Sequence, residues 1–185
     1  QDPEKRRGYE EVWLRSNYPK TYAYLKRFET ALLERAAFKR YFRETDPFYS
    51  MFDVGHYTFA PHKVVWLGFG AREMKVAVVS SVDGKPVMTN QAMHPFVAMH
   101  DKTEAFYLAA CLNSAPFEFG VVSHTQVGGK SFAQSNVLQT LRVPRFDPQD
   151  LLHLALSTLS QRAHALAAVI HDENASESAQ EKARA

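Results

Sequence analysis

The segment KVVWLGFGAREMKVAVVSSVDG (residues 63–84) decides the fold class, because two strand-like runs flank a glycine-rich turn within it. The runs KVVWL and MKVAVVSSV are rich in β-branched residues, which is typical of strands. Gly68 and Gly70 match the opening of a cofactor-binding loop, but such a loop requires a helix after the glycines, with its N-terminus facing the ligand. Because the second run is a strand instead, the segment predicts a strand–turn–strand unit and no cofactor site.

Downstream of this unit, turn and cap signals predict a hairpin and a helix. Asp83-Gly84 is the strongest hairpin signal in the chain and precedes a third strand-like run, KPVMTNQAM (85–93). Asp101 with Glu104 three residues later matches a capping box, which predicts that a helix begins at residue 101. The stretch FEFGVVSHTQ (117–126) after this helix is predicted to be extended or mixed.

Helical periodicity marks both ends of the chain. Residues 21–42 carry apolar side chains at spacings of three and four, which predicts one amphipathic helix that ends at Asp46-Pro47. A second helix is predicted over 151–170, followed by a polar tail that is either a fraying helix or a linker. The face of this helix that we expect to be buried contains Leu152, Leu156, Leu159, Leu166 and Val169.

These elements predict an α+β fold built on a mixed β-sheet, with an N-terminal helical arm (1–47), a mixed-sheet domain (48–150) and a C-terminal helix with its tail (151–185). Apolar residues make up 45% of the 185-residue chain, which is enough for one packed domain. No apolar run approaches the roughly 18 residues needed to cross a bilayer, so no membrane partner is expected. The single cysteine, Cys111, fits a reducing compartment, and we expect a cytoplasmic protein.

Positive charge is concentrated near the start of the chain. Residues 1–45 contain 11 Lys and Arg against 7 Asp and Glu, although the whole chain carries a net charge of only +2. A basic region of this kind suits phosphate groups or an acidic protein neighbour. A solvated helix face explains the same composition equally well.

Patterns for metal binding or catalysis are absent from the sequence. His153, His164 and His171 share one helix face, but they are separated by about 16 and 10 Å along the helix axis, too far for one metal ion. The chain contains no HExxH, paired CxxC or GxSxG motif, and the glycines of residues 127–131 lack the spacing of a phosphate-binding P-loop. We therefore assign no catalytic residue, no metal site and no cofactor site.

Four stretches in a fixed order carry a family resemblance: YPKTYAYLKRFETALLERA, FYSMFDVGHYTFAPHKVVW, EAFYLAACLNSAPFEF and LRVPRFDPQDLLHLALSTLSQRAHAL. Together they span roughly residues 18–166. In order and spacing they resemble the TaqI-like C-terminal specificity domain of bacterial adenine-N6 DNA methyltransferases, which is found in single-chain type II restriction–modification enzymes.

The resemblance implies a target recognition domain that binds double-stranded DNA. In this family the catalytic methyltransferase domain of the same chain binds S-adenosylmethionine and acts on a flipped adenine beside an Asn/Asp-Pro-Pro-aromatic motif. Pro-Pro does not occur in this sequence, so the segment is expected to recognise DNA without catalysing methyl transfer and to need no cofactor of its own. We expect it to be the C-terminal piece of a longer enzyme, although a tag or a trimmed terminus also explains the missing initial methionine.

The resemblance also indicates which loops contact DNA, namely residues 56–63 and 128–136. Phosphate contacts are expected from the cations Lys63, Lys130, Arg142 and Arg145. Contacts to the bases, either by stacking or by hydrogen bonding, are expected from His56, Tyr57, Ser131, Gln134 and Asn136. The alternative for each residue is a structural role, in which Tyr57 closes the sheet edge and the arginines cover a turn. The alternative function is a protein–protein assembly module without DNA contact.

Overall fold

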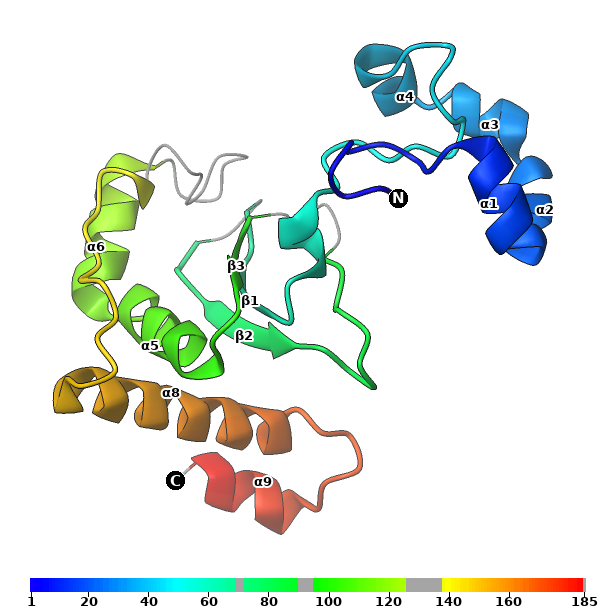
Figure 1. Ribbon diagram of the computed structural model, residues 1–185. Helices are drawn as coiled ribbons and strands as arrows, with labels where there is room; N and C mark the ends of the chain where they lie inside the picture. The colour runs from blue at the N-terminus through cyan, green and yellow to red at the C-terminus, as the bar shows by residue number, and fades with distance from the viewer. Residues whose placement is uncertain (69–71, 90–94, 126–137, 185) are drawn as a thin grey trace. The chain divides into compact units, whose positions relative to one another are not determined.

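The computed structural model describes residues 1–68, 72–89, 95–125 and 138–184 (Figure 1). The chain divides into two compact units, Gln1–Phe59 and Ala60–Ala185. The sequence places the end of the helical arm at residue 47, whereas the first unit continues to Phe59. The reason is that Phe48 and Tyr49 are buried and complete the core of this unit together with Leu14.

The first unit contains four short helices, α1 (Glu11–Asn17), α2 (Pro19–Lys26), α3 (Glu29–Leu33) and α4 (Ala36–Tyr41), and one 3₁₀ turn, η1 (His56–Phe59). The single helix predicted over 21–42 is therefore wrong. Arg35 leaves the helical conformation with ψ at 133°, and its guanidinium donates hydrogen bonds to the carbonyls of Phe48 and Ser50 at 3.0 and 2.8 Å. These tertiary bonds turn the chain toward the core and outweigh the local helical periodicity.

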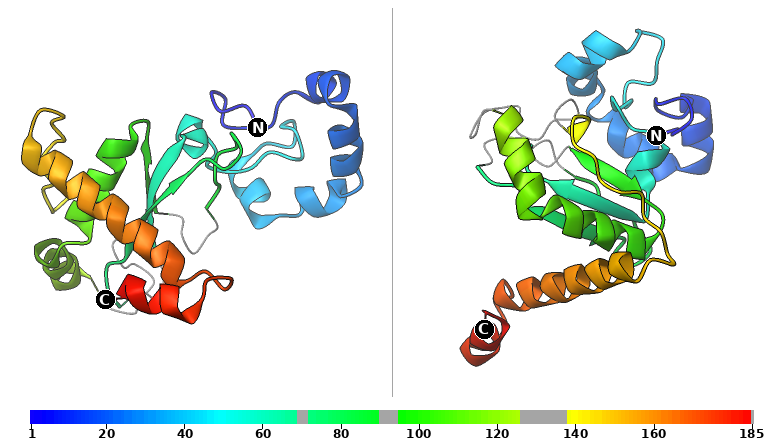
Figure 2. Two further views of the ribbon diagram at one scale, coloured as in Figure 1. Left: turned by 90° about the horizontal axis from the view of Figure 1, so that it is seen from below. Right: turned by 90° about the vertical axis from the view of Figure 1, so that its left-hand side faces the viewer.

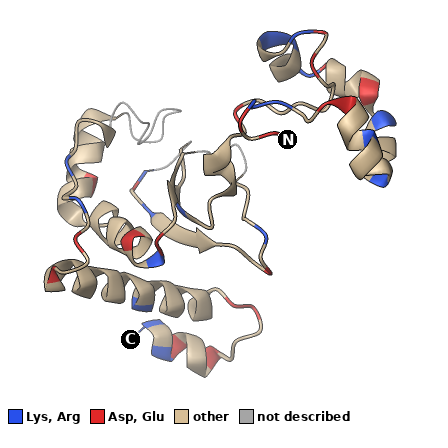
Figure 3. Cartoon of the chain, viewed as in Figure 1, with Lys and Arg blue, Asp and Glu red and all other residues tan. Residues whose placement is uncertain are grey.

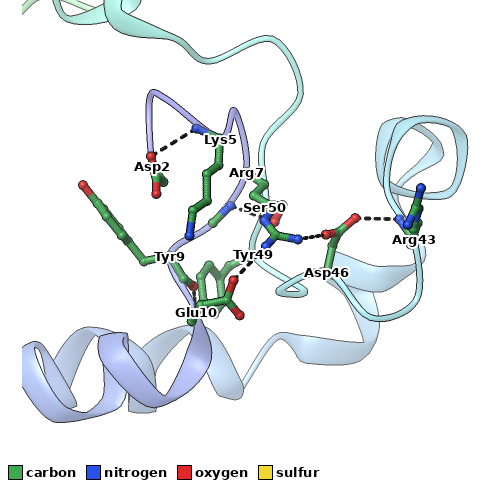
Figure 4. Close-up of polar contacts among 10 residues, drawn as sticks. Asp2, Lys5, Arg7, Tyr9, Glu10, Arg43, Asp46, Tyr49 and Ser50 are labelled. Carbon is green, nitrogen blue, oxygen red and sulfur yellow. Dashed lines mark hydrogen bonds and ion pairs between the residues drawn. The ribbon is translucent and has the colours of Figure 1, made fainter.

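An ion pair and hydrogen bonds join the beginning of the first unit to residues 46–50 (Figure 4). The Arg7 guanidinium lies 2.6 Å from the Asp46 carboxylate, and the Tyr49 hydroxyl donates to the Tyr9 carbonyl at 2.6 Å. Hydrogen bonds from the backbone N–H of Arg43 and from Arg7 hold the pKa of Asp46 below its ordinary value. The first nine residues are thus an integral part of this unit.

The second unit is built on a three-stranded sheet of β1 (His62–Trp66), β2 (Val76–Ser80) and β3 (Phe96–Met99) in the order β2-β1-β3. Its helices are α5 (Lys102–Leu112), α6 (Ala115–His124), α8 (Leu151–Ile170) and α9 (Glu177–Arg184). Helix α5 packs on the sheet, and α8 packs on α5 (Figures 1 and 2). This arrangement confirms the α+β class, and all strand pairs within the described residues are antiparallel.

The glycine-rich turn joins two antiparallel strands, as the sequence predicts. Trp66 at the end of β1 lies opposite Val76 at the start of β2, so a strand follows the LGFG segment, of which residues 69–70 lie outside the described residues. Asp83 and Gly84 adopt φ angles of 50° and 72°, the conformation of the predicted two-residue turn. The strand predicted over 85–93 does not form at residues 86–89, and residues 90–93 lie outside the described part of the chain; the strand that pairs with β1 in this region is β3, which begins at Phe96.

Helix α6 forms where an extended or mixed stretch is predicted over 117–126, of which residue 126 lies outside the described residues. A proline in its first turn suits a helix start, and Val121 is fully buried against the core, so this β-branched residue serves helix packing, while its neighbour Val122 is exposed. Within the residues that the structure describes, no single helix is long and apolar enough to cross a membrane. Helices α5 and α6 pass the same test as a pair, but they are bent by 64° at the break between them.

Side chains of α8 and of the residue that caps α5 cover the outer edge of β2. The Asn113 side chain accepts a hydrogen bond from the Val76 N–H at 2.8 Å and donates one to the Val76 carbonyl at 2.9 Å. His164 Nε2 accepts from the Val78 N–H at 2.9 Å, while Nδ1 donates to the Ser160 carbonyl at 2.7 Å. In an uncovered edge strand such backbone groups are unpaired and can bind a strand of another chain. Here side chains of the same unit bind them.

The boundaries of α8 are those that the sequence predicts, but the predicted buried face is wrong. Ser157 is fully buried and its hydroxyl donates to the Thr103 carbonyl at 2.9 Å, whereas Leu152 and Leu159 are 64% and 57% exposed. Serines let α8 approach α5 closely, and His164 on the same side reaches β2. The polar contacts of this face therefore decide the orientation of the helix.

This orientation predicts that Ser157 tolerates substitution less well than Leu159. Ser157→Leu forces a larger side chain into a filled site, and we expect it to lower the free energy of unfolding by about 1–3 kcal/mol. Leu159→Gln changes an exposed side chain and should alter that free energy by about 0.5 kcal/mol or less. Urea denaturation of the two variants measures both effects. A larger loss for Leu159→Gln would show that the predicted leucine face is the buried one.

Candidate nucleic-acid interface

Two predicted DNA-contacting residues, His56 and Tyr57, lie on η1 in the first unit. His56 is exposed. The Tyr57 hydroxyl donates to the Asp53 carboxylate at 2.5 Å, and burial together with this bond raises the pKa of Tyr57 to about 12. The Arg6 guanidinium lies 5.5 Å from the centroid of the Tyr57 ring, so a cation occupies one face of the ring. Tyr57 is thus held in place by side chains of its own unit.

Two predicted phosphate contacts, Arg142 and Arg145, are exposed on an anchored segment of the second unit. The Tyr107 hydroxyl donates to the Pro144 carbonyl between them at 3.0 Å, and the Phe146 ring packs on Tyr107 with 5.3 Å between ring centroids. Among the described residues, no carboxylate forms an ion pair with either guanidinium. Both charges are therefore available to an external anion.

Lys63, a third predicted phosphate contact, is buried, with a side chain only 1% exposed. Its ammonium donates to the Ala60 carbonyl at 3.1 Å and lies 5.8 Å from the centroid of the Phe96 ring. Burial lowers the pKa of Lys63 below its ordinary value. In this position Lys63 ties the start of β1 to the preceding loop and presents no charge to a phosphate.

The remaining predicted contacts, Lys130, Ser131, Gln134 and Asn136, lie outside the described residues. Their roles stay predictions. The residues that the structure describes thus place His56 and Tyr57 in one unit and Arg142 and Arg145 in the other.

The histidines of α8 and its C-terminal cap have local roles. His153 Nδ1 accepts a hydrogen bond from the Asp147 N–H at 3.0 Å, and His164 bonds to β2 as described above. His171, which caps the helix, is exposed. Across the described part of the chain, no three side chains of His, Cys, Asp or Glu gather closely enough to hold a metal ion.

Sequence reasoning missed a basic and aromatic pocket in the first unit. Figure 3 shows Lys and Arg on both the N-terminal loop and α4. The pocket encloses about 310 Å³, and its lining consists of Lys5, Arg6, Arg7, Tyr41, Phe42, Asp46, Phe52 and Asp53. The excess of basic residues over 1–45 was its only sequence signal, because periodicity cannot show that residues 5–7 lie beside residues 41–53.

Comparison with known proteins finds a similarity to one type II methyltransferase. No family model matches the chain. It is 30% identical over 102 residues to the type II methyltransferase M.NspV of Nostoc sp. (strain ATCC 29411 / PCC 7524). The match covers 55% of this chain and 20% of that methyltransferase, so the chain corresponds to about one fifth of the relative's length. A relationship to restriction–modification methyltransferases is thereby supported, while the TaqI-like specificity domain stays a prediction.

The buried ammonium of Lys63 predicts a stability that depends on pH. A lysine whose pKa is lower in the folded than in the unfolded state destabilises the fold while it is protonated, and this cost shrinks as the pH rises toward the unfolded-state pKa. Lys63→Met should therefore raise the free energy of unfolding at neutral pH by about 1 kcal/mol or more. The gain over the original chain should decrease as the pH rises toward the ordinary lysine pKa of 10.5, which denaturation at a series of pH values measures. A gain that is the same at every pH would contradict the assignment.

Proposed function

We propose that this chain binds double-stranded DNA as the specificity segment of a restriction–modification adenine-N6 methyltransferase. The observation that carries the proposal is the 102-residue similarity to a type II methyltransferase, which involves only one fifth of that protein. A segment of this size suits a module that positions DNA, with methyl transfer performed by the catalytic domain of the same chain. The whole enzyme's target sequence is then read partly by this segment.

The two exposed arginines of the second unit support the proposal chemically. A guanidinium is planar, stays protonated and donates paired hydrogen bonds to phosphate oxygens. Arg142 and Arg145 flank the carbonyl of Pro144, which is bonded to Tyr107, so the backbone that carries them is already ordered. Binding then costs less conformational entropy than it would on a free loop.

The proposal assigns S-adenosylmethionine to the catalytic domain. A nucleoside-binding glycine loop needs a helix N-terminus after the strand. Here β1 and β2 are successive antiparallel strands on either side of the glycine segment. The proposal therefore attributes no step of the transfer reaction to this turn.

Duplex binding measured over a salt series tests the proposal. Fluorescence anisotropy with mixed-sequence DNA duplexes gives the association constant at each salt concentration. On a double logarithmic plot, this constant should fall linearly as the salt concentration rises. Each lost phosphate contact reduces that slope by about 0.9, so Arg142→Ala combined with Arg145→Ala should reduce it by about 1.8.

Arg162→Ala is the matched control, because Arg162 is an exposed arginine on α8, away from the anchored segment. It should leave the slope unchanged. The absence of any duplex binding at low salt would overturn the proposed function. An equal loss from Arg162→Ala would instead overturn the assignment of the contacts to Arg142 and Arg145.

The exposed leucines of α8 favour a second candidate function, a protein contact. Leu152, Leu159 and Leu166 follow one another at intervals of seven residues and are all at least 46% exposed. Such spacing places them along one side of the helix, where an apolar protein surface can cover them. The partner that fits the proposal is the catalytic methyltransferase domain. If duplex binding fails, this assembly role without DNA contact is the remaining candidate.

A further inference from the structure

The pocket of the first unit combines cations with exposed aromatic rings. Its volume of about 310 Å³ lies at the lower end of the range for small-ligand sites, which extends over about 300–1,000 Å³. A site of this size accommodates a single nucleotide rather than a double helix. All of its lining residues belong to the first unit, so it is complete within that unit.

Two of its three cations are available to a ligand. Arg7 is occupied, because its guanidinium pairs with Asp46 at 2.6 Å and with Glu10 at 2.8 Å (Figure 4). Lys5 and Arg6 are exposed, and neither forms an ion pair with any described carboxylate. Lys5 and Arg6 therefore contribute positive charge to the lining of the pocket, and the Arg6 guanidinium also lies 5.5 Å from the centroid of the Tyr57 ring.

The aromatic part of the pocket is a stacked pair of rings. Tyr41 and Phe52 lie with 3.6 Å between ring centroids and an interplanar angle of 16°, yet they remain 46% and 49% exposed. The Arg40 guanidinium lies 5.2 Å from the centroid of the Tyr41 ring. A planar base placed on Phe52 would extend this stack by one layer, as bases do on aromatic side chains of single-strand-binding proteins.

The backbone holds these groups in uncommon conformations. Arg6 and Asp53 have φ angles of 51° and 56°, in the left-handed region that residues other than glycine seldom adopt. Asp53 follows Phe52 directly, and Arg6 follows Lys5, so each strained residue adjoins a group that faces the pocket. The Asp2 carboxylate accepts hydrogen bonds from the N–H groups of Glu4 and Lys5, which orders the turn. Strained backbone of this kind is found preferentially at ligand sites.

We propose that this pocket binds one unpaired nucleotide of a DNA strand, with the base stacked on Phe52 and the adjacent phosphate held by Lys5 and Arg6. The inference deepens the proposed function and rests on it for the identity of the nucleic acid. It assigns to the first unit a strand contact that does not depend on base sequence, separate from the arginines of the second unit.

Binding of a short single-stranded oligothymidylate to the 185-residue chain tests the pocket. Phe52→Leu should weaken binding about tenfold, because stacking of one base on an aromatic ring contributes roughly 1–3 kcal/mol, while Phe52→Trp should preserve it. Lys5→Gln combined with Arg6→Gln should lower the salt slope by about 0.7, since the two cations hold one phosphate and each neutralised phosphate of a single strand contributes about 0.7. An abasic strand of the same length should bind the original chain and Phe52→Leu equally.

Matched controls lie elsewhere in the same unit. Tyr24 is 58% exposed and packs on Phe28 with 5.3 Å between centroids, but it does not line the pocket, so Tyr24→Leu should leave binding unchanged. Lys20→Gln serves the same purpose for charge. Thermal unfolding of each variant shows whether the fold is intact, and Phe52→Trp keeps the test decisive if Phe52→Leu is unstable.

The outcomes separate this inference from the proposed function. If the chain binds duplex DNA and the Phe52 and Lys5–Arg6 variants bind the single strand like the original chain, the pocket assignment is overturned and the proposed function stands. If the single strand binds through the pocket and duplexes do not bind at all, the proposed function fails instead. Loss of duplex binding in the Arg142–Arg145 variant with retained single-strand binding supports both.

Discussion

The outer edge of β2 is the constraint on which the second unit depends. An edge strand carries backbone groups that must be paired, hydrated or covered. In this chain the carboxamide of Asn113 binds both backbone groups of Val76, and the imidazole of His164 binds the N–H of Val78. The first of these contacts positions the end of α5 and the second positions α8. The edge of a small sheet thereby determines where two helices lie.

This constraint explains which parts of the fold could be predicted from sequence. The cap at Asp101, the turn at Asp83-Gly84 and the limits of α8 follow from residues close together in the chain, and all three were predicted. The buried face of α8 depends instead on long-range contacts. Ser157 bonds to a residue 54 positions earlier in the chain, and His164 bonds to one 86 positions earlier. Hydrophobic periodicity contains no information on such contacts, so it assigned the leucines to the core. The guanidinium of Arg35 interrupts the predicted N-terminal helix between α3 and α4 for the same reason.

The candidate interface agrees with the sequence only in which arginines are exposed, and its contacts with DNA stay predictions. Arg142 and Arg145 are exposed as the resemblance implies, because a segment rich in proline and bounded by aromatic anchors stays at the surface. Lys63 differs most from its predicted role as a phosphate contact. A lysine in a strand is usually exposed, but here the side chain is buried and its ammonium donates a hydrogen bond to the Ala60 carbonyl. The pocket of the first unit escaped prediction because its cations and its rings come from opposite ends of that unit.

The contact between Arg7 and Asp46 closes a loop of the chain, since these residues are 39 positions apart. Closing a loop of this length removes conformational freedom from every residue inside it, so the four short helices, each too short to be stable in isolation, fold together or not at all. Because the Arg7–Asp46 ion pair holds the N-terminal segment in place, displacement of that segment would change the whole unit. A partner that drew residues 1–9 away would release the helices as a group and remove Lys5, Arg6 and Arg7 from the lining of the pocket in a single cooperative step.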